Sequence, residues 1–278
     1  MRASKRATER PLAPLSSTLV GKLAPTPSMP MASSEDKSSS RATRKSRHVI
    51  LFLAANPINI NRLAFDRECA AIEHELRLTE GRDVFDFRSK WAVTADEMMR
   101  HLNELHPAII HFSGHGQRAN TDRRSTTSRD IACGHNTDNG GLYLQDEHGN
   151  PQLVTARALK MMIKAAAAST RVVVLNACFS SFQATALRSV VDCVVGMTGA
   201  IRDDAARSFA IGFYRAIGNR RSISNAVEQA VAILAAKQLP DARYPRCRTR
   251  KGIDASQIVL GDIRRGSCVS EFEGRSGK

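Results

Sequence analysis

Short apolar runs recur along the chain, and most of them stop at a polar or turn-forming residue. They read H-V-I-L-F-L-A-A at 48–55, A-I-I-H-F at 108–112, V-V-V-L at 172–175 and C-V-V-G-M at 193–197. Compact runs that are rich in β-branched residues and bounded by Pro, Gly or Asn are typical of strands covered on both faces. A weaker alternation at 83–87 predicts one more strand.

Between these runs, apolar residues return at helical spacing. Leu63, Ile72 and Leu76 share one face of an expected helix over 63–79. The same spacing, or a capping residue, predicts further helices over 94–105, 155–168, 203–217 and 222–238. These helices alternate with the strands, which is the pattern of a parallel sheet with helical crossovers.

Two local signals refine this picture. Thr94 and Glu97 form a capping box, in which the hydroxyl and the carboxylate bind free amide groups of the first helical turn. A polar insertion at 117–139 is expected to be an exposed loop, and 141–154 is expected to be a small hairpin. The fold class that we predict is α/β, with a mostly parallel central sheet between two layers of helices.

The two ends of the chain differ from its middle. Residues 1–47 are rich in Ser, Arg, Pro and Ala and are expected to be disordered. They resemble a transit peptide, and the alternative is that translation begins at Met29 or Met31. Residues 48–239 form the predicted domain. Residues 240–278 are expected to be a poorly ordered basic tail, in which only 258–260 has the pattern of a short strand.

Charge and length limit the choice of partners. The chain has 278 residues and a formal net charge of +14, which by itself suggests nucleic acid or an anionic surface. The basic residues gather before residue 48 and again at 243–251, however, and the middle is nearer to balance. Nucleic acid is therefore expected to bind only through the tails.

The cysteines and histidines indicate a reducing compartment without a metal. Six cysteines occur without a C-x-x-C motif, which argues against a disulfide scaffold or a zinc ribbon and for a cytoplasmic protein. Cys133 and His135 are weak metal ligands, and His111 and His115 lie roughly 13 Å apart along a strand, too far to share one ion. No metal or other cofactor is expected, and no apolar run is long enough for a membrane span.

Candidate chemistry lies directly after two of the apolar runs. His115 follows A-I-I-H-F-S-G, and Cys178 follows V-V-V-L-N-A. The carboxyl ends of parallel strands meet at the edge where α/β folds bind ligands, so we expect the two side chains to lie together. A thiolate is a strong nucleophile, and an adjacent imidazole lowers the thiol pKa and protonates a leaving amine.

These residues also have simpler interpretations. A cysteine after a buried strand is, taken alone, more often a small core residue. His111 lies inside its strand and is expected to be a core histidine with satisfied hydrogen bonds. Asn176 is expected to hold the turn, and we assign it no chemical role.

Several motifs in a fixed order resemble one known family. H-F-S-G-H-G at 111–116, L-N-A-C-F-S at 175–180, G-M at 196–197 and I-R-D-D-A-A at 201–206 are similar to the CHAT domain. This domain is a caspase-like branch related to separase and the metacaspases. I-L-F-L-A-A-N-P at 50–57 and the helix at 209–214 also resemble it, so the similarity covers about 49–239.

The resemblance implies a caspase-like cysteine endopeptidase. His115 and Cys178 would be its catalytic dyad, and the backbone N–H groups of Gly116 and Cys178 its oxyanion hole. Similarity to separase places Asp203 near the S1 pocket, where it would attract a basic P1 side chain. The alternative is that Asp203 and Asp204 only complement a helix dipole.

The resemblance also implies partners. Family members commonly act as effectors in bacterial defence or signalling, so a protein substrate and an activating sensor protein are expected. Two other functions stay open: a catalytically silent CHAT-fold interaction module, and a basic protein associated with nucleic acid.

Overall fold

The computed structural model of this protein describes residues 47–118 and 140–260. The expected disorder before residue 47 therefore lies outside the described residues. So do most of the expected loop at 117–139, with Cys133 and His135, and the chain beyond residue 260. None of the helices within the described ranges is long and apolar enough to cross a bilayer.

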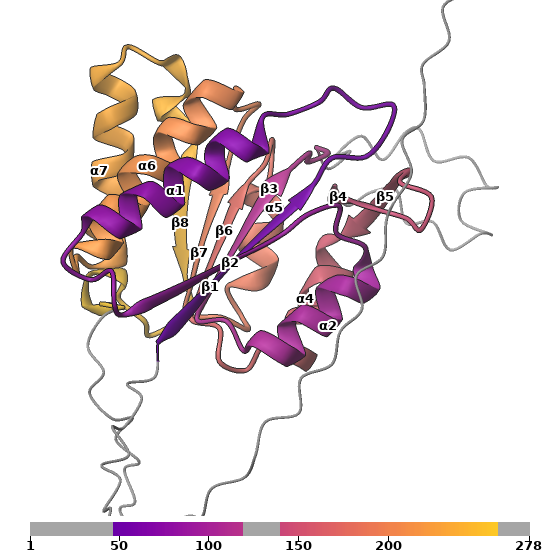
Figure 1. Cartoon of the computed structure of the whole chain (residues 1–278), viewed down its shortest axis with the longest axis horizontal. Coiled ribbons are helices and arrows are strands. Elements are labelled where there is room, and N and C mark those ends of the chain that lie inside the picture. Colours follow the sequence, from indigo (N-terminus) through magenta and orange to yellow (C-terminus); the bar gives the residue numbers. More distant parts are fainter. Residues whose placement is uncertain (1–46, 119–139, 261–278) are drawn as a thin grey trace, which may run out of the picture. The chain divides into compact units, whose positions relative to one another are not determined.

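A six-stranded sheet forms the middle layer (Figure 1). Its spatial order is β2 (Phe85–Lys90), β1 (His48–Ala55), β3 (Ile109–Gly114), β6 (Val172–Asn176), β7 (Cys193–Met197) and β8 (Pro245–Thr249). The first five strands are parallel, and β8 is antiparallel to β7. The chain moves from β1 outward to β2 and then returns to β3 on the other side of β1. This reversal opens a crevice at the carboxyl ends of β1 and β3.

Helices cover both faces of the sheet (Figure 1). The helices α1 (Phe65–Leu78), α6 (Asp203–Gly218) and α7 (Ile223–Ala236) pack on one face. The helices α2 (Ala95–Leu105), α4 (Ala156–Ala166) and α5 (Ser181–Leu187) pack on the other face, beside the hairpin of β4 (Gly141–Gln145) and β5 (Pro151–Thr155). The predicted α/β class and its three layers are confirmed.

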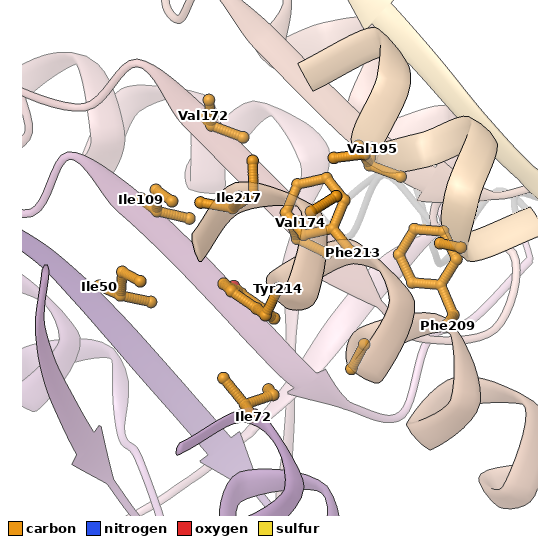
Figure 2. Close-up of a cluster of buried hydrophobic side chains, with 14 of the residues drawn as sticks. Ile50, Ile72, Ile109, Val172, Val174, Val195, Phe209, Phe213, Tyr214 and Ile217 are labelled. Carbon is orange, nitrogen blue, oxygen red and sulfur yellow. The ribbon is translucent and has the colours of Figure 1, made fainter. Parts of the chain in front are cut away.

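Alternation along the strands divides the core in two. Ile50 and Phe52 of β1 point to the α1, α6 and α7 side, whereas Leu51 and Leu53 point to the α2 and α4 side. Figure 2 shows the first cluster, in which aromatic residues of α6 lie over strand residues such as Val174. These strand positions are buried on both faces, which explains why their sequences are continuous apolar runs.

Capping hydrogen bonds confirm the predicted starts of two helices, α2 and α4. The Thr94 hydroxyl accepts a hydrogen bond from the Glu97 N–H at 3.2 Å, and the Glu97 carboxylate accepts one from the Thr94 N–H at 3.0 Å. This reciprocal pair confirms the capping box. Thr155 likewise caps α4 by accepting from the Ala158 N–H at 3.2 Å.

The structure corrects the expected domain boundary at residue 239. A short 3₁₀ helix (Pro240–Arg243), β8 and a second 3₁₀ helix (Ala255–Gln257) follow, and Ile258 and Leu260 are buried in the core. The expected strand at 258–260 is only a single bridge between Val259 and Ser222. The sequence P-R-C-R-T of β8 escaped detection because an edge strand pairs on one side only and needs no continuous apolar run.

A chain cut after Leu239 is therefore expected to unfold at a lower temperature, and less cooperatively, than a chain cut after Leu260. The shorter chain exposes the edge of β7 and removes Ile258 and Leu260 from the core. Thermal melts followed by circular dichroism compare the two chains directly. Equal midpoints would show that β8 does not stabilise the domain.

Candidate active site

Strands β3 and β6 are neighbours whose ends lie in register. Ser113 pairs with Asn176, and His115 and Cys178 each follow two residues further on. The backbones approach closely here, because a Cβ atom at Gly116 would collide with the Cys178 carbonyl group. The structure therefore brings His115 and Cys178 to adjacent segments at the carboxyl edge of the sheet.

Both side chains line one small cavity of about 50 Å³, which we call the dyad cavity. The other walls of the dyad cavity come from the segment before and at the start of α1, and from the start of α6. They include Leu63, Ala64, Phe65, Ile201 and Asp203. His115 and Cys178 are each half-buried, so they are sheltered from bulk water but remain accessible.

A strained turn presents Cys178. Phe179 has φ +55°, a conformation that costs a bulky residue of the order of 1–3 kcal/mol. Its N–H donates to the Gly199 carbonyl at 3.0 Å. The buried Ser180 hydroxyl donates to the Leu175 carbonyl at 2.8 Å and accepts from the Met197 N–H at 2.9 Å. These bonds hold the turn, so the chain leaves β6 sharply just after Cys178.

A backbone carbonyl orients His115. Its Nε2 atom lies 2.8 Å from the carbonyl oxygen of Asn61, in the loop between β1 and α1. A carbonyl oxygen only accepts, so we assign the ring proton to Nε2, which leaves Nδ1 free to accept a proton. Residue patterns do not reveal this partner, because any residue at position 61 offers the same carbonyl.

Burial keeps both groups uncharged at neutral pH. It raises the pKa of the Cys178 thiol above its ordinary value of 9.0; the backbone hydrogen bond at Ile201 acts in the opposite direction, and the negative charge of Asp203 raises the pKa further. Burial also lowers the pKa of His115 below its ordinary 6.5, although the Asn61 carbonyl and Asp203 act in the opposite direction. At rest the site therefore holds a thiol beside a neutral imidazole.

The two predicted oxyanion donors lie where β3 and β6 end. Gly116 pairs with Leu142 in an isolated β-bridge. The hydrogen bonds of this bridge are donated by the N–H groups of Gln117 and Tyr143 and not by that of Gly116. Within the described ranges, neither the Gly116 nor the Cys178 N–H donates to a backbone carbonyl. In the part of the chain that the structure describes, no backbone carbonyl therefore competes for these two donors.

Asp203 lies on the wall of the dyad cavity, at the first position of α6. Its Oδ2 atom accepts a hydrogen bond from the Ala64 N–H at 3.4 Å, across the cavity from α1. The neighbouring Arg202 is held by Asp241 at 2.7 Å, and the Asp204 carboxylate accepts from the Ala205 N–H at 2.9 Å. The position of Asp203 fits both a substrate pocket and a helix end.

A buried carboxylate that the sequence analysis did not single out, Glu68, also lines the dyad cavity. Glu68 of α1 accepts hydrogen bonds from His111 Nε2 at 2.9 Å, Ser113 Oγ at 2.6 Å and Asn176 Nδ2 at 2.6 Å. Ser113 and Asn176 stand two residues before His115 and Cys178, so one carboxylate ties together the two strand ends that carry the dyad. The available signal was an acidic residue on the apolar face of α1.

This network also includes His111, which was expected to be a core histidine, and Asn176, which was expected to hold the turn. His111 is buried and satisfied at both ring nitrogens, by Glu68 and by the Tyr214 hydroxyl at 3.0 Å, as predicted. Asn176 binds the Ala206 carbonyl at 3.0 Å in addition to Glu68. Burial alone would raise the pKa of Glu68, but the hydrogen bond and charge of His111, with the other two donors, hold it below the ordinary 4.5.

No metal site accompanies this arrangement in the part of the chain that the structure describes. There, no three His, Cys, Asp or Glu side chains come together in a way that could hold an ion.

Two relatives of this chain are named as proteases. The chain is 25% identical over 215 residues to a Roc-COR-CHAT protease from an unknown prokaryotic organism. It is 24% identical over 172 residues to a probable protease from Gillisia limnaea. These matches cover 74% and 61% of this chain, but only 18% and 27% of the relatives. The chain thus spans a minor part of the length of either relative.

Solved structures show the same fold. A secreted C11 cysteine protease from Bacteroides thetaiotaomicron, in complex with an irreversible peptide inhibitor, matches with a TM-score of 0.51 at 12% identity. The match covers 73% of this chain and 66% of that one. At this identity, the match shows that the two chains share a fold.

The CHAT domain family model matches residues 19–249, which is most of the chain and ends at the last residue of β8. The matched range extends past residue 239 and includes β8, and it confirms the resemblance drawn from the motifs. The protein belongs to the CHAT domain family.

Proposed function

We propose that this protein is a cysteine endopeptidase in which Cys178 is the nucleophile and His115 its proton-transfer partner. The observation that carries the proposal is the register of β3 and β6, which puts both side chains on the dyad cavity. Support also comes from the orientation of His115 by the Asn61 carbonyl, because a base that is itself held in place is typical of activated nucleophiles.

The geometry suggests the order of proton transfers. His115 Nδ1 takes the proton from the Cys178 thiol as the sulfur attacks the scissile carbonyl carbon, because Nε2 is bound to Asn61. The oxyanion that forms is stabilised by the N–H groups of Gly116 and Cys178. His115 then protonates the leaving amine, and water hydrolyses the thioester with His115 acting as base.

The resting protonation of the dyad is testable by alkylation. In the substrate-free protein, the rate at which iodoacetamide modifies Cys178 is expected to rise with pH and to reach its midpoint above pH 9.0, because burial raises the thiol pKa. The acid limb of kcat/KM is expected below pH 6.5, since burial lowers the pKa of His115. Mass spectrometry of the Cys178 peptide measures the rate of alkylation. Peptide cleavage at a series of pH values measures kcat/KM.

An Asp203→Asn variant is the control for the alkylation experiment. Asp203 raises the thiol pKa, so its neutralisation is expected to move the alkylation midpoint to lower pH. A midpoint near neutral pH in the wild type would contradict the neutral-thiol assignment. Unreactive Cys178 over the whole pH range would instead favour a silent interaction module.

The specificity proposal concerns Asp203. If its carboxylate forms part of the S1 pocket, the protein prefers Arg or Lys at P1, and Asp203→Ala lowers cleavage after Arg by at least about tenfold. The adjacent Asp204→Ala is a matched control, because Asp204 shares the helix end but does not line the dyad cavity. Cleavage of a mixed peptide library gives the P1 profile of each variant, and thermal melts check folding.

Equal P1 profiles for the wild type and Asp203→Ala would return Asp203 to a helix-end role.

The biological setting is proposed from the family resemblance: a cytoplasmic effector in a bacterial defence or signalling system, acting on a protein substrate and switched on by a sensor protein. Affinity capture with the Cys178→Ala variant, which would hold a substrate uncleaved, tests these partners.

A further inference from the structure

A second and much larger hollow lies beside the dyad cavity. Its volume is about 1110 Å³, and it opens at the carboxyl edge of β1 and β2. Its walls are the loop between β1 and α1, the start of α1, the two residues after β2, and Gln145 of the hairpin. We call it the Trp91 hollow. A space of this size accommodates several side chains of a bound peptide.

The Trp91 hollow presents apolar side chains to solvent. Trp91 is 47% exposed and Ile58 is 51% exposed, and both line the hollow. Part of the indole is anchored in the core, because its ring packs against Phe52 at 5.8 Å between ring centroids. Tryptophan is among the residue types that are enriched at the positions that dominate the binding energy of protein interfaces.

The walls of the Trp91 hollow are held in place by hydrogen bonds. The Ile58 N–H donates to the Gly149 carbonyl at 2.9 Å, and the Gln145 side chain donates to the Asn56 carbonyl at 3.1 Å. The backbones of Asn59 and Ala92 adopt φ +67° and +55°, which sets the loops that carry Ile58 and Trp91. A preformed surface loses little conformational entropy when it binds.

The Trp91 hollow and the dyad cavity share a wall. Leu63, Ala64 and Phe65 line both, and the hydrogen bond from Ala64 to Asp203 fixes this wall against α6. A polypeptide whose scissile bond lies at Cys178 therefore reaches the Trp91 hollow by crossing this wall.

The charges around the Trp91 hollow add a second preference. Its ionic side chains are the guanidinium groups of Arg62 and Arg67 and one carboxylate, Asp66, all of them exposed. The excess is positive, so an acidic residue beside the apolar anchor of a ligand is favoured over a basic one.

We propose that the Trp91 hollow is a substrate subsite that binds a bulky apolar side chain, preferably next to an acidic residue, on one side of the bond cleaved at Cys178. The inference rests on the proposed peptidase function. It adds a specificity determinant remote from P1, set by Trp91 and Ile58.

The experiment uses the fact that Trp91 is the only tryptophan of the chain. Tryptophan-free peptides with a central Arg, carrying a Leu-Glu pair at successive positions on either side, are titrated into the full-length Cys178→Ala variant. The same peptides with Ser-Ser in place of Leu-Glu are the matched probes. We expect a saturable change of Trp91 emission for the Leu-Glu peptides at one side of Arg, and binding at least about tenfold weaker for the Ser-Ser peptides.

Cleavage kinetics in the active protein provide the second readout. Trp91→Ala and Ile58→Ala are each expected to raise KM for the preferred Leu-Glu peptide about tenfold, with little change in kcat and none for the Ser-Ser peptides. Leu78→Ala is the matched control, because Leu78 is 69% exposed and does not line the hollow. Ile58→Ala keeps the test valid if Trp91→Ala unfolds, since Ile58 is not among the core residues.

The outcomes separate the two proposals. Normal cleavage with unchanged KM in both variants would overturn the subsite and leave the peptidase intact. Saturable, Leu-dependent Trp91 emission without any cleavage would show that the Trp91 hollow binds peptide, while the peptidase proposal fails and with it the role of the hollow as a substrate subsite. Absence of both cleavage and Leu-dependent binding would overturn the subsite as well.

Discussion

Replacing Cys178 or His115 by Ala is expected to abolish peptide cleavage while leaving the fold nearly intact. Both residues are half-buried and line the dyad cavity, and Cys178 only packs against the margin of one apolar cluster, so neither truncation opens a large hole in the core. Removal of a nucleophile or of its base typically costs about three or more orders of magnitude in turnover, because the two act as a unit.

Two matched variants make this test specific. Cys247→Ser changes a thiol on the edge strand β8, and His74→Ala removes an exposed histidine of α1; neither lines the dyad cavity. Both are expected to cleave like the wild type. Residual turnover within tenfold of the wild type in Cys178→Ala, about 1.4 kcal/mol of barrier, would remove Cys178 from the catalytic role.

Glu68→Ala is expected to have the largest effect on stability, and to impair cleavage without touching the dyad. The truncation leaves the buried donors of His111, Ser113 and Asn176 without their acceptor, and each buried polar group that is left unsatisfied costs about 1–3 kcal/mol. The ends of β3 and β6 then lose the hydrogen-bond acceptor that they share, so the positions of His115 and Cys178 are less well fixed. Urea denaturation and peptide cleavage measure the two effects.

Glu68→Gln distinguishes the hydrogen bonds from the charge. The amide oxygen still accepts from His111 and Asn176, and the Ser113 hydroxyl can rotate to accept from the amide nitrogen, so much of the lost stability is expected to return. Glu75→Ala is the matched control on the same helix. Its partner Arg215 is about half exposed, and Glu75 does not line the dyad cavity. Normal cleavage by a folded Glu68→Ala protein would contradict the positioning role.

The carboxyl of Glu68 also gives a pH signature. Its folded-state pKa lies below the ordinary 4.5, so its contribution to stability is fully present above pH 4.5 and is lost as pH falls through the folded value. The difference in unfolding free energy between the wild type and Glu68→Gln is therefore expected to shrink on acidification below that pH.

The apolar patterning of the chain predicted most of the sheet. Strands β1, β3, β6 and β7 are buried on both faces, so each is a compact apolar run that is visible without its neighbours. Helix starts were equally readable, because the Thr94 and Thr155 caps act within one turn. The helix ends shifted by a residue or two, and the short α5 went unpredicted because its seven residues hold little periodicity.

The sequence by itself determined the α/β class, the alternation of strands and helices, and the two strand ends at which His115 and Cys178 stand, because all of these depend on local periodicity. Only the tertiary structure decided what surrounds them. The partners of Glu68 on β3 and β6 lie 45 and 108 residues away, and the Asn61 carbonyl lies 54 residues from His115. Strand β8 depends on pairing with β7, and the Trp91 hollow on three segments that are far apart in the chain. Contacts between such distant segments leave no periodic signal in the chain, since each residue type is compatible with many partners until the fold selects one.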